Sequence, residues 1–158
     1  PTLILPTSWH RRSTTSSAAS PTASAKLPAM QRSAEAITIP WIFHSDGNLT
    51  IVMEDLLTLG MNCVNPFEPP CMDLKAAKEK WGDRICLWGN IDLVKTLPYG
   101  TVEEVEAEVK QRIEDAGAGG GYICATANSI TGFCKIENVF AMTNAVQKYG
   151  VYPLEWID

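Results

Sequence analysis

The 158-residue sequence lacks the features that mark several large classes of protein. No apolar run approaches the roughly 20 residues that a membrane-crossing helix needs, so we expect no membrane span. Residues 41–158 carry nine Lys and Arg against seventeen Asp and Glu, which leaves no basic face for a nucleic acid. The five cysteines include no Cys-x-x-Cys pair. We therefore expect no disulfide framework but buried free thiols, as in a cytoplasmic protein.

Residues 1–26 differ in composition from the rest of the chain. They contain no acidic residue, and they hold eleven Ser and Thr together with three Pro, a composition that does not form a hydrophobic core. The segment has no apolar stretch typical of a secretory signal, and its Arg- and Ser-rich start superficially resembles an organelle transit peptide. We interpret residues 1–26 as a disordered tail, a targeting segment or residues unrelated to the domain, and residues 27–158 as the domain.

Four short apolar runs after residue 27 alternate with helical patterns, which predicts a parallel α/β sheet. Strands are expected at residues 40–44, 61–65, 85–88 and 121–125, and their near-continuous apolar character predicts burial on both faces. Two architectures fit this order of elements. One is an open doubly wound sheet, and the other is half of a (β/α)8 barrel, because a complete barrel takes about 250 residues.

The helices between these strands are predicted from their caps and apolar spacing. A first helix over 27–37 precedes the first strand, and Asn48 is expected to cap a helix over 49–59. Asp73 is expected to cap the next helix, and a Thr-Val-Glu-Glu capping box at residues 101–104 starts another. The buried faces of the later helices are expected to hold Leu74, Ala77 and Trp81, then Val102, Val105, Val109 and Ile113, and finally Val139, Met142, Val146 and Tyr149.

Polar side chains follow the C-terminal end of every predicted strand. In chain order they are His44 and Asp46, Asn65 and Glu68, Asn90 and Asp92, and Thr126, Asn128 and Ser129. The carboxyl ends of parallel strands share one rim, and active sites of α/β proteins are built at that rim. The sequence therefore predicts a polar site there, whereas the connections at the opposite rim carry mostly turn residues.

His44 and Asp46 are the most informative pair on this rim. Their spacing supplies either two ligands to a divalent metal ion such as zinc, or a carboxylate that holds the imidazole in one tautomer. A hydrogen-bonded structural histidine is the alternative. Zinc takes three protein ligands, and the remaining candidates, Glu68 and Asn128, are oxygen donors from other loops. For Asn90 and Asp92 the alternative is a solvated loop in which they cap backbone groups.

Five short motifs occur in a distinctive order. They are His44-Ser-Asp-Gly-Asn48, Gly89-Asn-Ile-Asp92, Gly100-Thr-Val-Glu-Glu-Val105, Gly120-Gly-Tyr-Ile123, and Glu137-Asn138 with Tyr149-Gly150. Together they resemble the C-terminal half of the uroporphyrinogen decarboxylase superfamily. The resemblance implies four βα units of a (β/α)8 TIM barrel. It also implies one of two chemistries, cofactor-free decarboxylation of a tetrapyrrole or zinc-dependent methyl transfer from a corrinoid to a thiol.

The chain departs from both branches of that superfamily. The methyltransferases use a His-x-Cys motif and a later Cys, and the matching positions here are His44, Asp46 and Asn128. The decarboxylases have a histidine in a Gly-His-Gly stretch that reads Ala127-Asn128-Ser129 here. The resemblance implies catalytic roles for His44, Asp46 and Asn128, and a metal, if one is used, on His44 and Asp46. From their positions on the rim, Glu68, Asn90, Asp92 and Ser129 are the predicted substrate-binding residues.

Half a barrel leaves two open sheet edges, on the strands that bear His44 and Tyr122. We therefore expect a partner, which is either a missing N-terminal half or a second copy related by a two-fold axis. The expected ligand is a tetrapyrrole or a corrinoid-linked small molecule. An inactive truncated fragment is the alternative from outside the enzymes.

Overall fold

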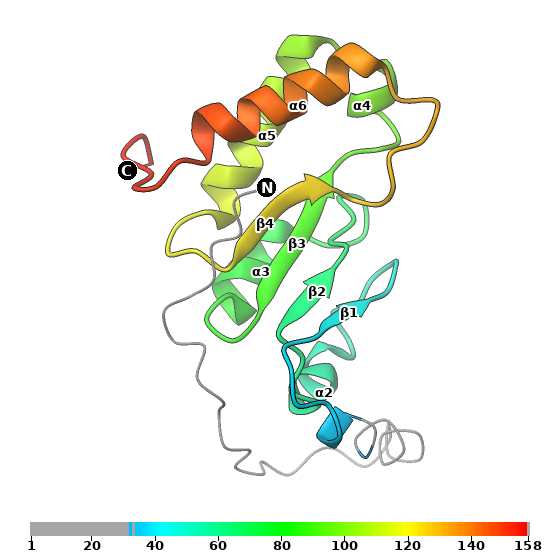
Figure 1. The fold of residues 1–158 in the computed structure, drawn as a ribbon, viewed down its shortest axis with the longest axis vertical. Helices are drawn as coiled ribbons and strands as arrows, with labels where there is room; N and C mark the ends of the chain where they lie inside the picture. The colour runs from blue at the N-terminus through cyan, green and yellow to red at the C-terminus, as the bar shows by residue number, and fades with distance from the viewer. Residues whose placement is uncertain (1–31, 33, 158) are drawn as a thin grey trace.

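The computed structural model describes residues 32 and 34–157 of the chain. Four strands form one parallel sheet in the order β1-β2-β3-β4 (Figure 1). The strands are β1 (Ile42–His44), β2 (Cys63–Asn65), β3 (Cys86–Ile91) and β4 (Tyr122–Thr126). The prediction of a parallel α/β sheet built from four βα units is confirmed. The expectations for residues 1–26, and most of the helix expected over 27–37, concern residues outside the described part.

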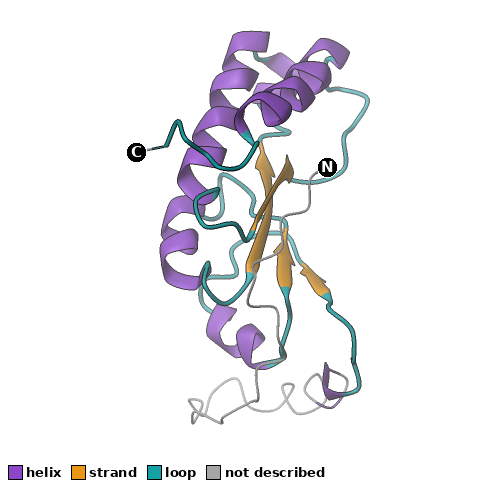
Figure 2. Ribbon diagram, turned by 60° about the vertical axis from the view of Figure 1, so that its left-hand side comes forward, coloured by secondary structure: helices purple, strands orange, loops and turns teal. Residues whose placement is uncertain are grey.

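The helices lie on one side of this sheet. They are α2 (Met53–Thr58), α3 (Leu74–Trp81), α4 (Thr96–Tyr99), α5 (Val102–Ala116) and α6 (Ile136–Tyr149). In Figure 2 most of the purple helices lie to the left of the orange strands and the others stand above them, and α6 packs against α5. The core lies between these layers and is centred on Val64 and Leu87 of the sheet and Val105 and Val109 of α5. No helix in the part of the chain that the structure describes is long and apolar enough to cross a membrane.

Two predicted helix starts are confirmed because their hydrogen bonds are local. The Asp73 carboxylate accepts from the amide of Ala76 at 3.0 Å and so caps α3. In the capping box of α5, Glu104 accepts from the Thr101 amide at 2.8 Å while the Thr101 hydroxyl accepts from the Glu104 amide at 3.3 Å. The expected buried faces of both helices are also present, apart from Val102.

Three details of the helix predictions are wrong. Helix α2 begins at Met53, because the Asn48 side chain accepts from the nearby Thr50 amide and closes a turn there instead of capping a helix. Val102, the first residue of α5, is 41% exposed although it lies on the same helical stripe as the buried Val109. In α6 the fully buried residues are Asn138, Ala141 and Ala145, so the expected apolar stripe is only half-buried and lies one residue away from the buried face.

The strand predictions need two corrections. β1 is not a buried strand, because Ile42 on the sheet edge is 50% exposed and His44 is also exposed. β3 runs on to Ile91, so Asn90 lies inside the strand and not in a loop after it. The second correction follows from strand pairing. The extent of a strand depends on the neighbour it pairs with, and the pairing of β3 with β4 continues to Ile91 and Thr126.

Candidate functional site

Two loops that are far apart in the sequence meet at the C-terminal rim of the sheet. The Asn128 side-chain amide, after β4, donates to the Asp46 carboxylate, after β1, at 3.1 Å. These loops follow the two edge strands, whose axes would lie about 14 Å apart in a flat sheet of parallel strands. The contact therefore requires the two loops to converge over the ends of β2 and β3. This convergence brings two of the three residues with predicted catalytic roles into direct contact.

His44 lies beside this pair at the end of β1. Its Nε2 atom is 4.0 Å from Asp46 Oδ1, and both side chains are more than half exposed. Its other ring nitrogen, Nδ1, is 2.7 Å from Oδ1 of Asn65, the residue that pairs with His44 in the register of β1 and β2. The imidazole is therefore held on one side by the neighbouring strand and faces the Asp46 carboxylate on the other. All three predicted catalytic residues lie together.

Glu68 joins the same cluster from the loop after β2. Its Oε2 atom accepts from the Gly47 amide at 2.7 Å, which ties the loop after β2 to the loop that bears Asp46. The Cys71 thiol lies 3.6 Å from the same oxygen and donates to it. Partial desolvation and this hydrogen bond raise the pKa of Cys71, so the thiol stays protonated. Glu68 therefore shapes the loops around the site, and one of its two carboxylate oxygens is already used.

The remaining predicted residues have other positions. Asp92 accepts from the amides of Val94 and Lys95 at 2.6 and 3.1 Å, so its carboxylate closes the turn before α4, as the loop-capping alternative describes.

Asn90 is 1% exposed inside β3, and neither polar atom of its side chain has a hydrogen-bond partner among the described residues. Ser129 contacts Asn128 through its backbone amide, at 2.8 Å from Asn128 Oδ1. The structure thus gathers His44, Asp46, Glu68 and Asn128, with Ser129 adjoining them.

Asn65 belongs to this cluster although it is not among the residues predicted to act on substrate. Its Oδ1 contacts His44, and its Nδ2 lies 3.5 Å from the Trp88 carbonyl of β3. Its place at the end of a predicted strand was the only sequence signal. The pairing with His44 depends on strand register, which the sequence of a single chain does not specify.

The donor set at this rim does not make up a three-ligand zinc site. Among residues 32 and 34–157, no three His, Cys, Asp or Glu side chains converge as metal ligands do. His44 and Asp46 supply two potential metal ligands. The third neighbour, Asn128, turns its amide nitrogen toward Asp46 and donates a hydrogen bond there, so it does not act as a ligand. The thiol of Cys71 is protonated and directed to Glu68. The described residues at this rim therefore do not fit a zinc ion.

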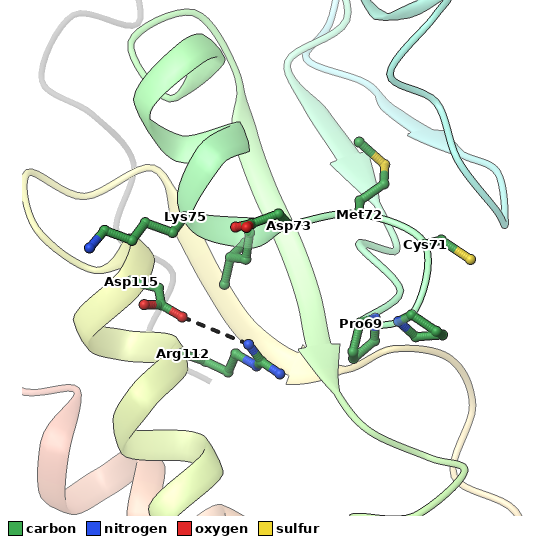
Figure 3. A pocket seen from close by; sticks show the side chains of 9 residues that line it. Pro69, Cys71, Met72, Asp73, Lys75, Arg112 and Asp115 are labelled. Carbon is green, nitrogen blue, oxygen red and sulfur yellow. Dashed lines mark ion pairs between the residues drawn. The ribbon is translucent and has the colours of Figure 1, made fainter.

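A hollow of about 450 Å³ lies beside the loop after β2, next to α3 and α5. It is lined by residues 69–75 with Arg112 and Asp115 of α5. Figure 3 shows the Arg112–Asp115 ion pair, at 3.7 Å, facing the segment that leads into α3, while the sulfur of Cys71 points away from it. Two acidic and two basic side chains balance within it, so it has no charge preference for a ligand. None of the predicted site residues lines this pocket.

Comparisons with known proteins agree with the motifs. A family model described as uroporphyrinogen decarboxylase (URO-D) matches residues 23–149. A uroporphyrinogen decarboxylase from Methylococcus capsulatus is 34% identical over 77 residues, which are 49% of this chain and 21% of that protein. One from Methylobacillus flagellatus is 36% identical over 75 residues, or 48% of this chain and 21% of that protein.

Methyltransferases match a longer part of the chain. The methylcobamide:CoM methyltransferase MtaA of Methanosarcina barkeri is 26% identical over 120 residues, which are 76% of this chain and 34% of that protein. A solved methyltransferase from Methanosarcina mazei has a TM-score of 0.65 at 26% identity, and the match covers 79% of this chain and 36% of that one. The chain thus spans only about a fifth to a third of the length of these relatives.

Proposed function

The chain belongs to the uroporphyrinogen decarboxylase family, and from this premise we propose that its rim cluster binds a tetrapyrrole-related ligand. The proposal concerns the part of a (β/α)8 barrel that carries His44, Asp46 and Asn128. In the full-length protein this site would serve decarboxylation of a porphyrin precursor or related chemistry. The chain alone would bind ligand without turning it over, because half a barrel encloses half of an active site.

The observation that carries the proposal is the contact between Asn128 and Asp46. It joins polar side chains from the loops after the two edge strands into one group of neighbouring residues, at the rim where barrel enzymes hold their ligands. The group is acidic, because Asp46 and Glu68 lie in it and no Lys or Arg pairs with either among the described residues. An anionic group of hydrogen-bond acceptors selects a ligand that presents N–H donors.

A tetrapyrrole fits this requirement through its pyrrole nitrogens. Asp46 has one carboxylate oxygen bonded to Asn128, and its other oxygen has no partner among the described residues. A carboxylate that accepts from pyrrole N–H groups makes charge-assisted hydrogen bonds, which contribute about 1.5–3 kcal/mol each. Asn128 would act by holding the Asp46 carboxylate in place, and His44 by flanking the bound ring.

A second candidate function is methyl transfer from a corrinoid with an altered metal site. The longer matches favour it, because the two methyltransferases align with about three quarters of this chain while the decarboxylases align with about half. The His44-Asp46 pair stands where those enzymes have His-x-Cys, and both thiols are replaced. A carboxylate and an amide are poor substitutes for thiolate on zinc, which is why this candidate ranks second.

Ligand binding separates these candidates. The 158-residue chain is titrated with uroporphyrin, followed by fluorescence anisotropy, and in parallel with methylcobalamin, followed by absorbance. We expect uroporphyrin to bind, and Asp46→Asn to weaken that binding about 10- to 100-fold, because this change removes the charge but keeps an oxygen for Asn128. The matched control is Asp83→Asn, which removes an exposed aspartate near the opposite rim and should leave the affinity unchanged.

Each other result has a definite meaning. Binding of methylcobalamin without uroporphyrin supports the methyltransferase reading. Equal weakening by Asp46→Asn and Asp83→Asn would show that only net charge matters. It would contradict ligand binding at the rim cluster. No binding of either compound by a folded chain supports the inactive-fragment alternative.

A further inference from the structure

The contact between His44 and Asn65 is a short hydrogen bond between two side chains of the rim cluster, with His44 Nδ1 and Asn65 Oδ1 2.7 Å apart. The two residues are partners in the register of β1 and β2, so their side chains leave the sheet on the same face. At this distance one of the two atoms must carry a hydrogen. Which atom carries it decides the chemical state of the imidazole.

The second contact of the Asn65 side chain fixes which way its amide group points. Nδ2 lies 3.5 Å from the carbonyl oxygen of Trp88, and that carbonyl also accepts from the Phe67 amide at 3.2 Å. A flipped amide would place Asn65 Oδ1 against the Trp88 carbonyl oxygen, which sets two acceptors against each other. The nitrogen of Asn65 therefore faces Trp88, and its oxygen faces His44.

The hydrogen must then be on the histidine, because an amide oxygen only accepts. We propose that Asn65 is a positioning residue that holds His44 as the Nδ1–H tautomer. In the neutral ring the lone pair is then on Nε2, the nitrogen that lies 4.0 Å from Asp46 Oδ1. Two contacts between neighbouring strands, His44 with Asn65 and Asn65 with Trp88, fix this tautomer.

This arrangement makes His44 and Asp46 a matched pair of acceptors. Their separation of 4.0 Å is too long for a hydrogen bond between them, and neither atom carries a hydrogen for the other. Asp46 Oδ1 already accepts from Asn128, and its second lone pair can accept, together with the lone pair of His44 Nε2, from a donor placed between them, such as a ligand N–H group. The pair thus selects a ligand by its donors, and a ligand that offers only acceptors at this point is rejected.

The opposite tautomer would remove this selectivity. With the hydrogen on Nε2, His44 would present a donor toward Asp46, and the two residues would no longer be two acceptors that face each other. The identity of the ligand rests on the proposed function, but the tautomer is a property of the ligand-free chain. It is therefore measured without any ligand.

The test uses the full 158-residue chain labelled with ¹⁵N-histidine at a pH where the imidazole is neutral. The chain has two histidines, and His10→Gln leaves the signals of His44 alone. Long-range ¹H–¹⁵N correlation spectra distinguish a protonated from an unprotonated ring nitrogen. We expect the protonated type at Nδ1 and the unprotonated type at Nε2.

Two substitutions test whether Asn65 is the cause. Asn65→Asp keeps an oxygen that accepts from Nδ1–H and should retain the tautomer. Asn65→Leu has a similar size but no acceptor, and the Nε2–H form should become the major one. If Asn65→Leu does not give the circular dichroism spectrum of a folded chain, Asn65→Ser replaces it, because the shorter hydroxyl does not reach the ring.

Two results would overturn the proposal. The first is a protonated Nε2 in the unaltered chain. The second is an Nδ1–H signal that persists in Asn65→Leu, or in Asn65→Ser, which would show that another group sets the tautomer. Neither result bears on whether uroporphyrin binds, so failure of this inference and failure of the proposed function remain distinguishable.

Discussion

The buried amide of Asn138 offers the sharpest test of how the site region is built. Asn138 is 1% exposed on α6, and its Nδ2 lies 3.3, 3.0 and 3.0 Å from the carbonyl oxygens of Thr96, Leu97 and Gly100. These carbonyls belong to the short helix α4 and its C-cap, and Thr96 is the one among them that also accepts from a backbone amide of that helix, Gly100 N. The Asn138 side chain therefore links α6 by hydrogen bonds to the segment between β3 and α5, which also contains Asp92.

The expected loss of stability depends on how many hydrogen bonds Asn138→Leu removes and on whether the three carbonyl oxygens keep another donor. An amide nitrogen has two hydrogens, so Asn138→Leu removes the equivalent of two hydrogen bonds. None of the three carbonyls is left without a donor, because each also accepts from Gly100 N, Lys135 N or Lys135 Nζ. The loss is therefore two net hydrogen bonds, without the desolvation penalty of an orphaned group. We expect a loss of about 1–3 kcal/mol in unfolding free energy.

The assay compares Asn138→Leu with Asn144→Leu, which makes the same change at an exposed position of the same helix. Thermal unfolding followed by circular dichroism should show a decrease of roughly 2–12 °C for the first variant, at about 2–4 °C per kcal/mol. The control should remain within about 0.5 kcal/mol of the unaltered chain in urea unfolding. Equal midpoints for the two variants would refute the assignment of a capping role to Asn138.

Three further predictions test other parts of the molecule. Hydrogen bonds from Arg84 and Trp81 lower the pKa of Glu54 to about 2. Its stabilisation is therefore complete above the ordinary value near 4.5 and is lost as the pH falls toward 2. Because Glu54 is half-exposed, we expect Glu54→Gln to cost at most about 1 kcal/mol at pH 7, and a cost that does not shrink in acid would contradict this. The open edges of β1 and β4 predict that the 158-residue chain forms dimers or larger assemblies in sedimentation velocity, and a compact monomer with a cooperative melt would count against a half barrel. Because His44 and Asp46 offer only two ligands and no third converges with them among the described residues, we expect the purified chain to bind no stoichiometric zinc, cobalt or iron, and a tightly bound ion that His44→Ala releases would contradict this.

The candidate site could be predicted in outline but not in its contacts. His44, Asp46, Glu68 and Asn128 were identified from their positions after strands, because the ends of parallel strands always share a rim. Asp92 follows a strand in the same way, yet its carboxylate is used by the two amides that come directly after it. Asn90 was expected in a loop and lies within β3. The position of a residue on the rim does not say whether its side chain is free.

The sequence by itself determined the order of the elements and the helix starts that are capped from within three residues. The Asp73 cap and the Thr101–Glu104 box are interactions of residues close in the chain, so their partners can be read from spacing. Alternation of apolar runs and amphipathic patterns was likewise sufficient for four βα units, because each element buries its own apolar face.

Only the tertiary structure decided which polar groups meet. Asp46 and Asn128 are 82 residues apart, and their contact depends on how two edge-strand loops converge at the rim. His44 and Asn65 meet because β1 and β2 pair in one register, and a shift of a single residue would turn one of the two side chains to the other face. Asn138 caps a helix 38 to 42 residues earlier in the chain. Such contacts are set by the packing of whole elements against each other, and no local pattern in the sequence encodes them.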